Sequence, residues 1–204
     1  MDSPFQLSEL ETDLLAELFN IGVGKAADSL SRMVNQQVKL SVPKVEIKSV
    51  KVMSEYLGGD TEICSVSQEM RGCFDARSIL MFHEENSMEV VRQLMGSNLP
   101  DEMVAEMQEE ALSEIGNIVL NACIGAIGSS LEQEFEVDLP QFQQGTALEL
   151  LSPSTTSENS SVLLIRIHME LTDCAVKGYL AFLLGPTSQE NLHASLRTML
   201  EKFS

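Results

Sequence analysis

Two short stretches of this 204-residue sequence place a glutamate three residues before an asparagine. In "ELFN" Glu17 precedes Asn20, and in "EIGN" Glu114 precedes Asn117. Residues three apart on a helix share a face, with their Cβ atoms about 5–6 Å apart. A carboxylate can bind a lysine or a water, and an amide can hold a water by donating one hydrogen bond and accepting another. Each pair could therefore orient a water for attack on a phosphoryl group, as a glutamine does in some phosphoryl-transfer enzymes.

The two pairs lie 97 residues apart, and other features of the sequence follow the same spacing. Pro43 and Pro140 are separated by this distance, and apolar residues recur at it along both stretches. Self-similarity at a fixed spacing is the mark of an internal repeat. The sequence therefore predicts one domain built of two related halves, about residues 1–97 and 98–204.

Each half is predicted to begin with a long amphipathic helix. In the first half, Ser8 and Glu11 form a capping box, and apolar residues follow it along one helical face. In the second half, Pro100 precedes a similar apolar stripe. Several strands follow in each half, and a shorter helix closes it. The predicted strands are 38–53, 61–67 and 72–83 in the first half and 135–142, 146–151, 161–171 and 177–185 in the second; the closing helices are 84–96 and 187–200.

Two local signals complete this assignment. Thr187 and Glu190 have the spacing of a capping box at the start of the last helix. Residues 152–161 are rich in Ser, Thr and Pro, which predicts an exposed loop between two strands. Helices that flank hairpin-linked strands are typical of an α+β fold. The strands of two related halves could join into one sheet about a pseudo-twofold axis.

The charge of the chain excludes several classes of partner. Thirteen basic and 31 acidic side chains give a formal net charge of −18, which repels nucleic acid and anionic membranes. We find no stretch of 18 apolar residues, so no membrane insertion is expected. The four cysteines form no CxxC pair, and no metal-ligand cluster is evident. These features favour a cytoplasmic protein that needs no bound metal.

The repeated pattern resembles the active-site signature of the CheC, CheX and FliY phosphatases of bacterial chemotaxis. That signature reads D-x-x-x-E-x-x-N, followed by 22 residues and a proline. It is matched by Asp13, Glu17, Asn20 and Pro43 in the first half and by Glu110, Glu114, Asn117 and Pro140 in the second. Glu110 departs from the Asp or Ser of the family at the accessory position. Two copies in one chain are similar to CheC, whereas CheX-like proteins carry one and FliY adds a further domain.

The resemblance implies a fold, a reaction and a partner. The fold is a pseudo-twofold arrangement in which long paired helices pack on a largely antiparallel sheet. The reaction is dephosphorylation of a CheY-type response regulator, which supplies an aspartyl phosphate, a Mg²⁺ ion and a lysine. The family glutamate engages that lysine, and the asparagine positions the attacking water. No cofactor is then expected on this chain, because Mg²⁺ is held by the phosphorylated regulator.

Other functions fit the same residues less well. A CheC-like chain could instead bind a response regulator or the receptor deamidase CheD with little or no turnover. Glu17 and Glu114 could be the carboxylate pair of a glycosidase, but each has its own asparagine, which favours two copies of one site. Glu190 and His193 have the spacing of a di-iron ligand pair, yet that chemistry uses two such pairs. Phosphate release from a phosphorylated regulator discriminates between a phosphatase and a binding protein.

Overall fold

A computed structural model describes residues 5–42, 44–95, 99–152, 161–171 and 174–202 of the chain. Seven elements precede residue 96, in the order helix, two strands, helix, two strands, helix, and the seven that follow have the same order. The first set is α1 (Glu9–Val34), β1 (Lys39–Ser41), β2 (Val45–Ser49), α2 (Val50–Tyr56), β3 (Glu62–Arg71), β4 (Ala76–His83) and α3 (Glu84–Met95). The second set is α4 (Asp101–Leu131), β5 (Glu136–Val137), β6 (Gln141–Thr146), α5 (Ala147–Leu151), β7 (Ser161–Leu171), β8 (Cys174–Leu184) and α6 (Pro186–Glu201).

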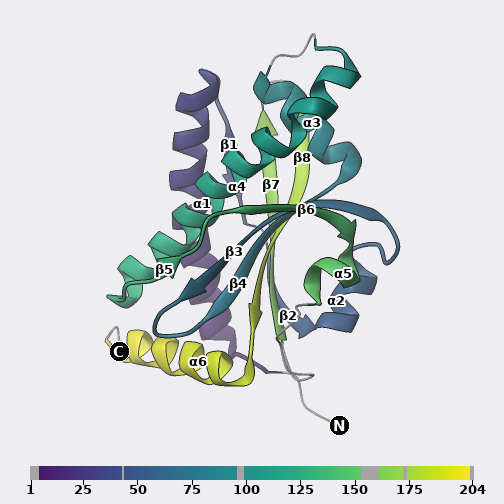
Figure 1. The fold of residues 1–204 in the computed structure, drawn as a ribbon. Coiled ribbons are helices and arrows are strands. Elements are labelled where there is room, and N and C mark those ends of the chain that lie inside the picture. The colour runs from purple at the N-terminus through teal and green to yellow at the C-terminus, as the bar shows by residue number, and fades with distance from the viewer. Residues whose placement is uncertain (1–4, 43, 96–98, 153–160, 172–173, 203–204) are drawn as a thin grey trace.

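The strands form one eight-stranded sheet with the order β1-β7-β8-β4-β3-β5, in which β2 also pairs with β7 and β6 also pairs with β3 (Figure 1). Every pairing among the described strands is antiparallel. The short strands of each half pair with a long strand of the other half, and β4 pairs with β8 at the centre. The two halves are therefore interleaved in a single sheet.

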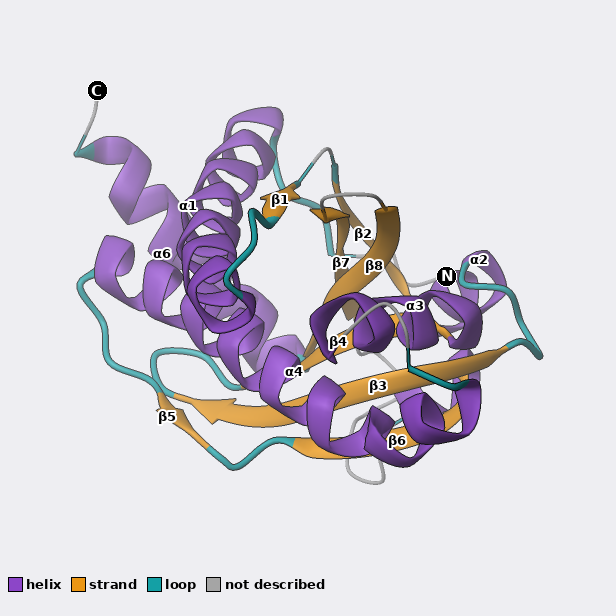
Figure 2. Ribbon diagram, turned by 90° about the horizontal axis from the view of Figure 1, so that it is seen from above, coloured by secondary structure: helices purple, strands orange, loops and turns teal. Residues whose placement is uncertain are grey.

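Helices cover both faces of this sheet. On β4, Leu80 and Phe82 belong to the main core with the four longer helices, whereas Ile79 and Met81 pack with the short helices α2 and α5 on the other face. Successive side chains of a strand point to opposite faces, so this alternation places apolar residues in both layers. Figure 2 shows α1 and α4 packed together along the sheet. The predicted α+β fold, with long paired helices on an antiparallel sheet, is confirmed.

The predicted capping box at the start of α1 is confirmed. The Ser8 hydroxyl accepts a hydrogen bond from the Glu11 backbone N–H, and the Glu11 carboxylate accepts from the Ser8 backbone N–H at 2.7 Å. Glu11 is buried, and its Oε1 lies 2.8 Å from Nε2 of His193 on α6. Burial raises the pKa of Glu11, but hydrogen bonds from Ser8 and the charges of His193 and Arg197 outweigh it, so this pKa lies below its ordinary value. These contacts attach the beginning of α1 to α6.

A glycine allows the two long helices to approach closely. A Cβ atom added to Gly22 of α1 would lie 2.7 Å from Cα of Cys123 on α4. Because that neighbour is backbone, it could not move without separating the helices. Cys123 is itself buried at this contact, and burial raises the pKa of its thiol to about 12. The spacing of α1 and α4, which carry the two Glu-Asn pairs, thus depends on Gly22.

We therefore expect opposite effects of alanine at two neighbouring glycines. Gly22→Ala should lower the free energy of unfolding by about 1–2 kcal/mol, because overpacking outweighs the gain in helix propensity. Gly24→Ala is the matched control, since a Cβ there meets nothing within 4 Å. It should raise the free energy of unfolding by about 0.5–1 kcal/mol. Urea unfolding of the two variants measures both changes, and a stabilised Gly22→Ala protein would contradict the close contact.

Two segments that were predicted to be strands are short helices. Residues 50–53 begin α2 and residues 147–151 form α5. The side chains of Ser49 and Thr146 cap these helices by accepting hydrogen bonds from the backbone N–H groups of Val52 and Glu149. A run of five to seven residues is too short for its periodicity to distinguish a buried helix from a strand. The capping residues were the local signal that these segments are helices. Ser49 and Thr146 lie 97 residues apart, the spacing of the repeat.

The predicted capping box of the last helix is wrong. Helix α6 begins at Pro186, with Gly185 as its N-cap and no side-chain capping hydrogen bond. Proline is favoured at the first helical position because its missing N–H has no partner there in any case. Thr187 therefore lies inside the helix. The predicted polar loop at 152–161 falls almost wholly on residues 153–160, which lie outside the described residues.

Helix α4 is long and apolar enough, by length and composition, to cross a membrane. In its most apolar 18-residue window, 61% of the residues are buried inside the protein. The helix packs against α1, α3 and the sheet. Its apolar character is accounted for by this position in the core.

Candidate functional site

The first Glu-Asn pair lies on the outer face of α1. Glu17 and Asn20 are exposed, as is Asp13 one turn earlier. Between them, Leu18 and Phe19 point into the core, where the Phe19 ring lies 5.3 Å from that of Phe182. The apolar face of the helix therefore packs in the core, and its polar face, with Glu17 and Asn20, is exposed to solvent. Among the described residues, the Glu17 carboxylate has no hydrogen-bond or ion-pair partner.

The amide of Asn20 is oriented by the backbone. Its Oδ1 accepts a hydrogen bond from the backbone N–H of Val42 at 3.2 Å. A backbone N–H can only donate, so the oxygen of this amide must face Val42. No described residue accepts a hydrogen bond from Nδ2 of Asn20, whose two N–H groups are left for a ligand. Val42 directly precedes Pro43, the predicted motif residue that lies outside the described residues.

The second pair lies on α4 and is less exposed. Glu114 is exposed and, like Glu17, unpaired among the described residues, whereas Asn117 is half-buried. Between them Gly116 touches strand β3, since an added Cβ would overlap the side chain of Val66. This close approach brings Asn117 near side chains of the sheet.

Two side chains that sequence reasoning missed contact Asn117. Its Oδ1 accepts hydrogen bonds from Nδ2 of Asn121 at 2.7 Å and from Nε2 of Gln68 at 3.4 Å. Gln68 also donates to the backbone carbonyl of Asp138 at 3.2 Å. The signal for Gln68 was its place in β3, where Cys64 and Val66 precede it on the inward face and Gln68 interrupts the apolar alternation. Asn121 lies one turn after Asn117, on the same face.

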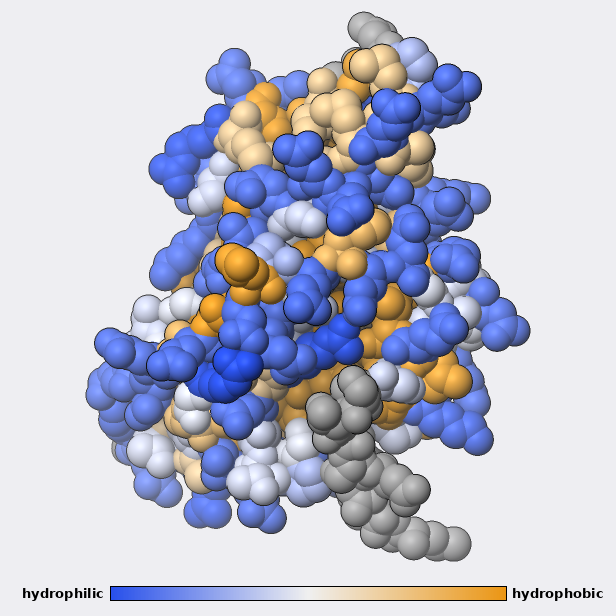
Figure 3. Space-filling view, in the orientation of Figure 1, coloured by the Kyte–Doolittle hydropathy of each residue, from blue (hydrophilic) through white to orange (hydrophobic). Residues whose placement is uncertain are grey.

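A cavity of about 580 Å³ adjoins the second pair. It brings together four predicted residues, namely Glu110, Glu114, Asn117 and Pro140. The rest of its lining is mainly apolar and comes from α1, α3 and α4; it comprises Met33, Val34, Leu94, Met95, Ala111 and Ser113. In the space-filling view of one face, apolar side chains group over α3 and the beginning of α4 within a largely polar surface (Figure 3). The second site thus combines acidic groups with an apolar cavity.

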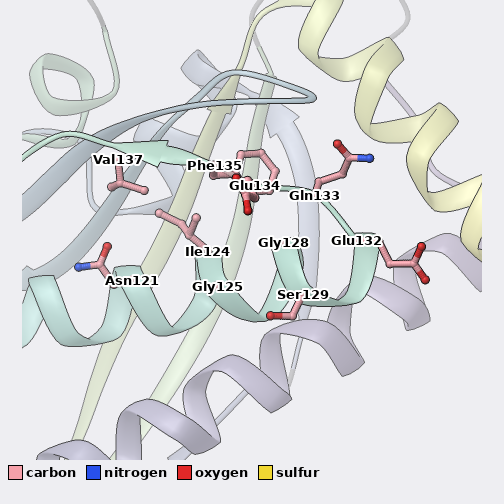
Figure 4. Close-up of a pocket in the computed structure, with 10 residues that line it drawn as sticks. All are labelled: Asn121, Ile124, Gly125, Gly128, Ser129, Glu132, Gln133, Glu134, Phe135 and Val137. Carbon is pink, nitrogen blue, oxygen red and sulfur yellow. The ribbon is translucent and has the colours of Figure 1, made fainter.

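A further cavity of about 490 Å³ follows α4 beyond Asn121. Figure 4 shows Asn121 at one end of its lining and Glu132 at the other, with the segment from Gln133 to Val137 opposite the helix. None of the predicted site residues lines it. Asn121 is thus shared between this cavity and the amide contacts of Asn117. Within the described part of the chain, no three His, Cys, Asp or Glu side chains are grouped so that they could hold a metal ion.

Two family models match the chain. The model of the CheC-like family matches residues 10–47, which include the first pair. The model described as "Chemotaxis phosphatase CheX" matches residues 64–165, half of the chain, which include the second pair. These matches show that the chain belongs to the CheC/CheX/FliY family of chemotaxis proteins, and the fold agrees with this membership.

Individual relatives extend the similarity over nearly the whole chain. CheY-P phosphatase CheC of Bacillus subtilis (strain 168) is 23% identical over 205 residues, covering 95% of this chain and 97% of the relative. The crystal structure of FliY from Thermotoga maritima matches with a TM-score of 0.77 at 18% identity, covering 95% of this chain and 98% of that one. The middle domain of FliM from H. pylori matches with a TM-score of 0.63 at 10% identity, covering 93% and 99%. At these identities the solved structures establish the shared fold.

Proposed function

We propose that this chain hydrolyses the aspartyl phosphate of a CheY-type response regulator in the cytoplasm, as part of chemotaxis signalling. One observation carries the proposal. On each long helix an asparagine has its carbonyl oxygen held by the fold, and its N–H groups have no acceptor among the described residues. Beside it lies an exposed glutamate that has no partner within the same residues. The name of the relative CheY-P phosphatase CheC supports the choice of substrate.

The glutamates are proposed to bind the lysine of the regulator. Glu17 and Glu114 are exposed and have no positive partner among the described residues. A net charge of −18 repels a phosphorylated surface. The partner must therefore bring its own cations to the contact, and a lysine beside the phosphoryl group would serve this role. A charge-assisted hydrogen bond of this kind contributes about 1.5–3 kcal/mol.

The asparagines are proposed to position the attacking water. The water oxygen forms a bond to phosphorus while the bond between phosphorus and the aspartyl oxygen breaks, and the electron pair returns to the carboxylate. A water proton passes to the departing phosphate, so the products are inorganic phosphate and a free aspartate. Mg²⁺ held by the regulator would neutralise charge on the phosphoryl oxygens. An acyl phosphate is already reactive, so orientation of the water accounts for the catalytic role of this chain.

The two amides differ in what they can offer a water. Oδ1 of Asn20 accepts one hydrogen bond from the fold and so keeps a lone pair, whereas Oδ1 of Asn117 accepts two. Asn20 can therefore both donate to a water and accept from it. Asn117 can only donate, and a proton of its water must find an acceptor on the substrate.

The cavity beside Glu114 favours a second candidate function, that of a binding protein. An apolar cavity of about 580 Å³ suits the docking of a protein partner whether or not phosphate is released. The chain could then bind a response regulator or the deamidase CheD with little turnover. Intact glutamate and asparagine in both pairs favour catalysis over binding alone.

Phosphate release separates the two functions. We expect the chain to accelerate phosphate release from a regulator that was phosphorylated with acetyl phosphate and then freed of excess donor. Regulator alone measures spontaneous hydrolysis, and regulator with chelated Mg²⁺ tests the dependence on its own metal. Tight binding of the phosphorylated regulator without any acceleration would contradict the phosphatase proposal and support the binding protein.

A further inference from the structure

The carbonyl oxygen of Asn117 is held by side chains, whereas that of Asn20 is held by backbone. Gln68 and Asn121 both direct an amide nitrogen at Oδ1 of Asn117. Asn121 comes from the same helix, one turn later, and Gln68 comes from strand β3. The orientation of the second amide therefore depends on two residues outside the Glu-Asn motif.

The orientation of the Gln68 amide follows from its contact with a backbone carbonyl. Nε2 of Gln68 lies 3.2 Å from the carbonyl oxygen of Asp138, which can only accept a hydrogen bond. The nitrogen of Gln68 must therefore occupy this side of its amide, and the same nitrogen lies 3.4 Å from Oδ1 of Asn117. A rotation of Asn117 by 180° about its last bond would place its N–H groups against the N–H donor of Gln68, whose own orientation is fixed by Asp138. The network thus favours one orientation, with the N–H groups of Asn117 away from Gln68 and Asn121.

A buried glutamine is unusual in the core, and its contact with Asn117 would account for Gln68. Gln68 is 3% exposed on the inward face of β3, and its Oε1 is buried without a hydrogen-bond partner in the described structure. An unpaired buried amide oxygen is costly. Beside the first site the corresponding position, on strand β7, is apolar. Phe142 of β6 pairs with Val66, and Val45 of β2, 97 residues before Phe142, pairs with Ile165.

This register makes Ile167 the counterpart of Gln68, since each lies two residues further along its strand. Ile167 is 2% exposed and needs no hydrogen bond. The first site has no need of an amide there, because Val42 already orients Asn20. In the second half Leu139, 97 residues after Val42, is 84% exposed, and no backbone N–H to Asn117 is present in the described structure.

We propose that Gln68 and Asn121 are positioning residues of the second site, which hold Asn117 with its N–H groups directed at the attacking water. This inference rests on the proposed phosphatase function. The oxygen of Asn117 is saturated by Gln68 and Asn121, and the amide therefore acts as a donor alone. The first site works without such residues.

The experiment measures turnover from one site at a time. In an Asn20→Ala background only the second site is active, and Gln68→Leu removes the amide there with little change of volume. If the correct orientation of Asn117 falls from nearly all molecules to about one in ten, kcat falls about tenfold with KM unchanged. Asn121→Ala, at an exposed position, should lower kcat in the same way by a smaller factor. Gln108→Leu is the control, since Gln108 is a buried glutamine of α4 that bonds Ser87 and does not contact Asn117.

The reciprocal background separates local positioning from damage to the fold. In an Asn117→Ala background only the first site is active, and Gln68→Leu should leave its kcat unchanged. Equal loss in both backgrounds would show a structural role and overturn the inference. Unchanged kcat of Gln68→Leu and Asn121→Ala with the second site alone would overturn it too, while the phosphatase function stood. Full turnover by the double variant Asn20→Ala/Asn117→Ala would overturn both this inference and the phosphatase function.

Discussion

The Asn20→Asp/Asn117→Asp protein is expected to lose nearly all phosphatase activity while remaining folded. Aspartate keeps an oxygen that can accept from the Val42 N–H at the first site and from Gln68 and Asn121 at the second. It replaces only the N–H donors, and puts a negative charge beside the phosphoryl group. Loss of a group that positions the nucleophile should lower kcat at least a hundredfold, which corresponds to about 2.7 kcal/mol in the barrier. Each single variant should keep the turnover of the remaining site.

Alanine variants complete this test but are expected to disturb the fold more. Asn20→Ala leaves the Val42 N–H without its partner, and Asn117→Ala leaves one N–H of the buried Gln68 amide without its acceptor, while the other keeps the Asp138 carbonyl. Each should lower the free energy of unfolding by about 1 kcal/mol. Asn191→Ala, at an exposed position of α6, is the control and should match the wild type in turnover and stability. A double aspartate variant with full activity would rule out a catalytic role for both amides.

The Glu17→Lys/Glu114→Lys protein is expected to bind the phosphorylated regulator very weakly. Removing the proposed contact to a lysine costs about 2 kcal/mol, or roughly 30-fold in affinity, and an introduced positive charge adds repulsion. The effect should appear in KM more than in kcat, since the asparagines are intact. Glu17→Ala and Glu114→Ala should each raise KM by a smaller factor, because they remove the contact without adding a positive charge. Turnover at a series of regulator concentrations separates the two parameters.

Charge alone must be controlled in this experiment. Glu106→Lys/Glu109→Lys changes the net charge by the same amount at exposed positions of α4 that belong to neither pair and do not line the cavity. Long-range attraction or repulsion is screened over about 8 Å at physiological salt, whereas a direct ion pair is screened less. The control should therefore retain most of its affinity at 0.15 M salt. Equal weakening of both double variants would point to net charge and away from a specific lysine contact.

The sequence was sufficient for the features that depend on local geometry. The capping box of Ser8 and Glu11 located the start of α1, because a helix N-terminus is signalled by residues within one turn. The spacing of three residues placed Glu17 with Asn20, and Glu114 with Asn117, because helical periodicity puts such residues on one face. The predicted strands at 72–83 and 161–171 likewise correspond to β4 and β7 of the structure. The resemblance to the CheC family rested on the same local spacings.

Two kinds of feature required the tertiary structure, namely very short helices and contacts between residues far apart in the sequence. The five to seven residues of α2 and α5 carry too little periodicity to exclude a strand, and their packing against the sheet adds to the local signal of their caps. Gln68 and Asn117 are separated by 49 residues, and Gly116 allows their contact only because α4 lies directly on β3. The sequence could show that an asparagine stands in each pair. Which way its amide faces was decided by donors outside the pair, among them Val42 and Gln68 from distant parts of the chain. An amide is nearly symmetric in shape, and only its hydrogen-bond partners distinguish its two ends.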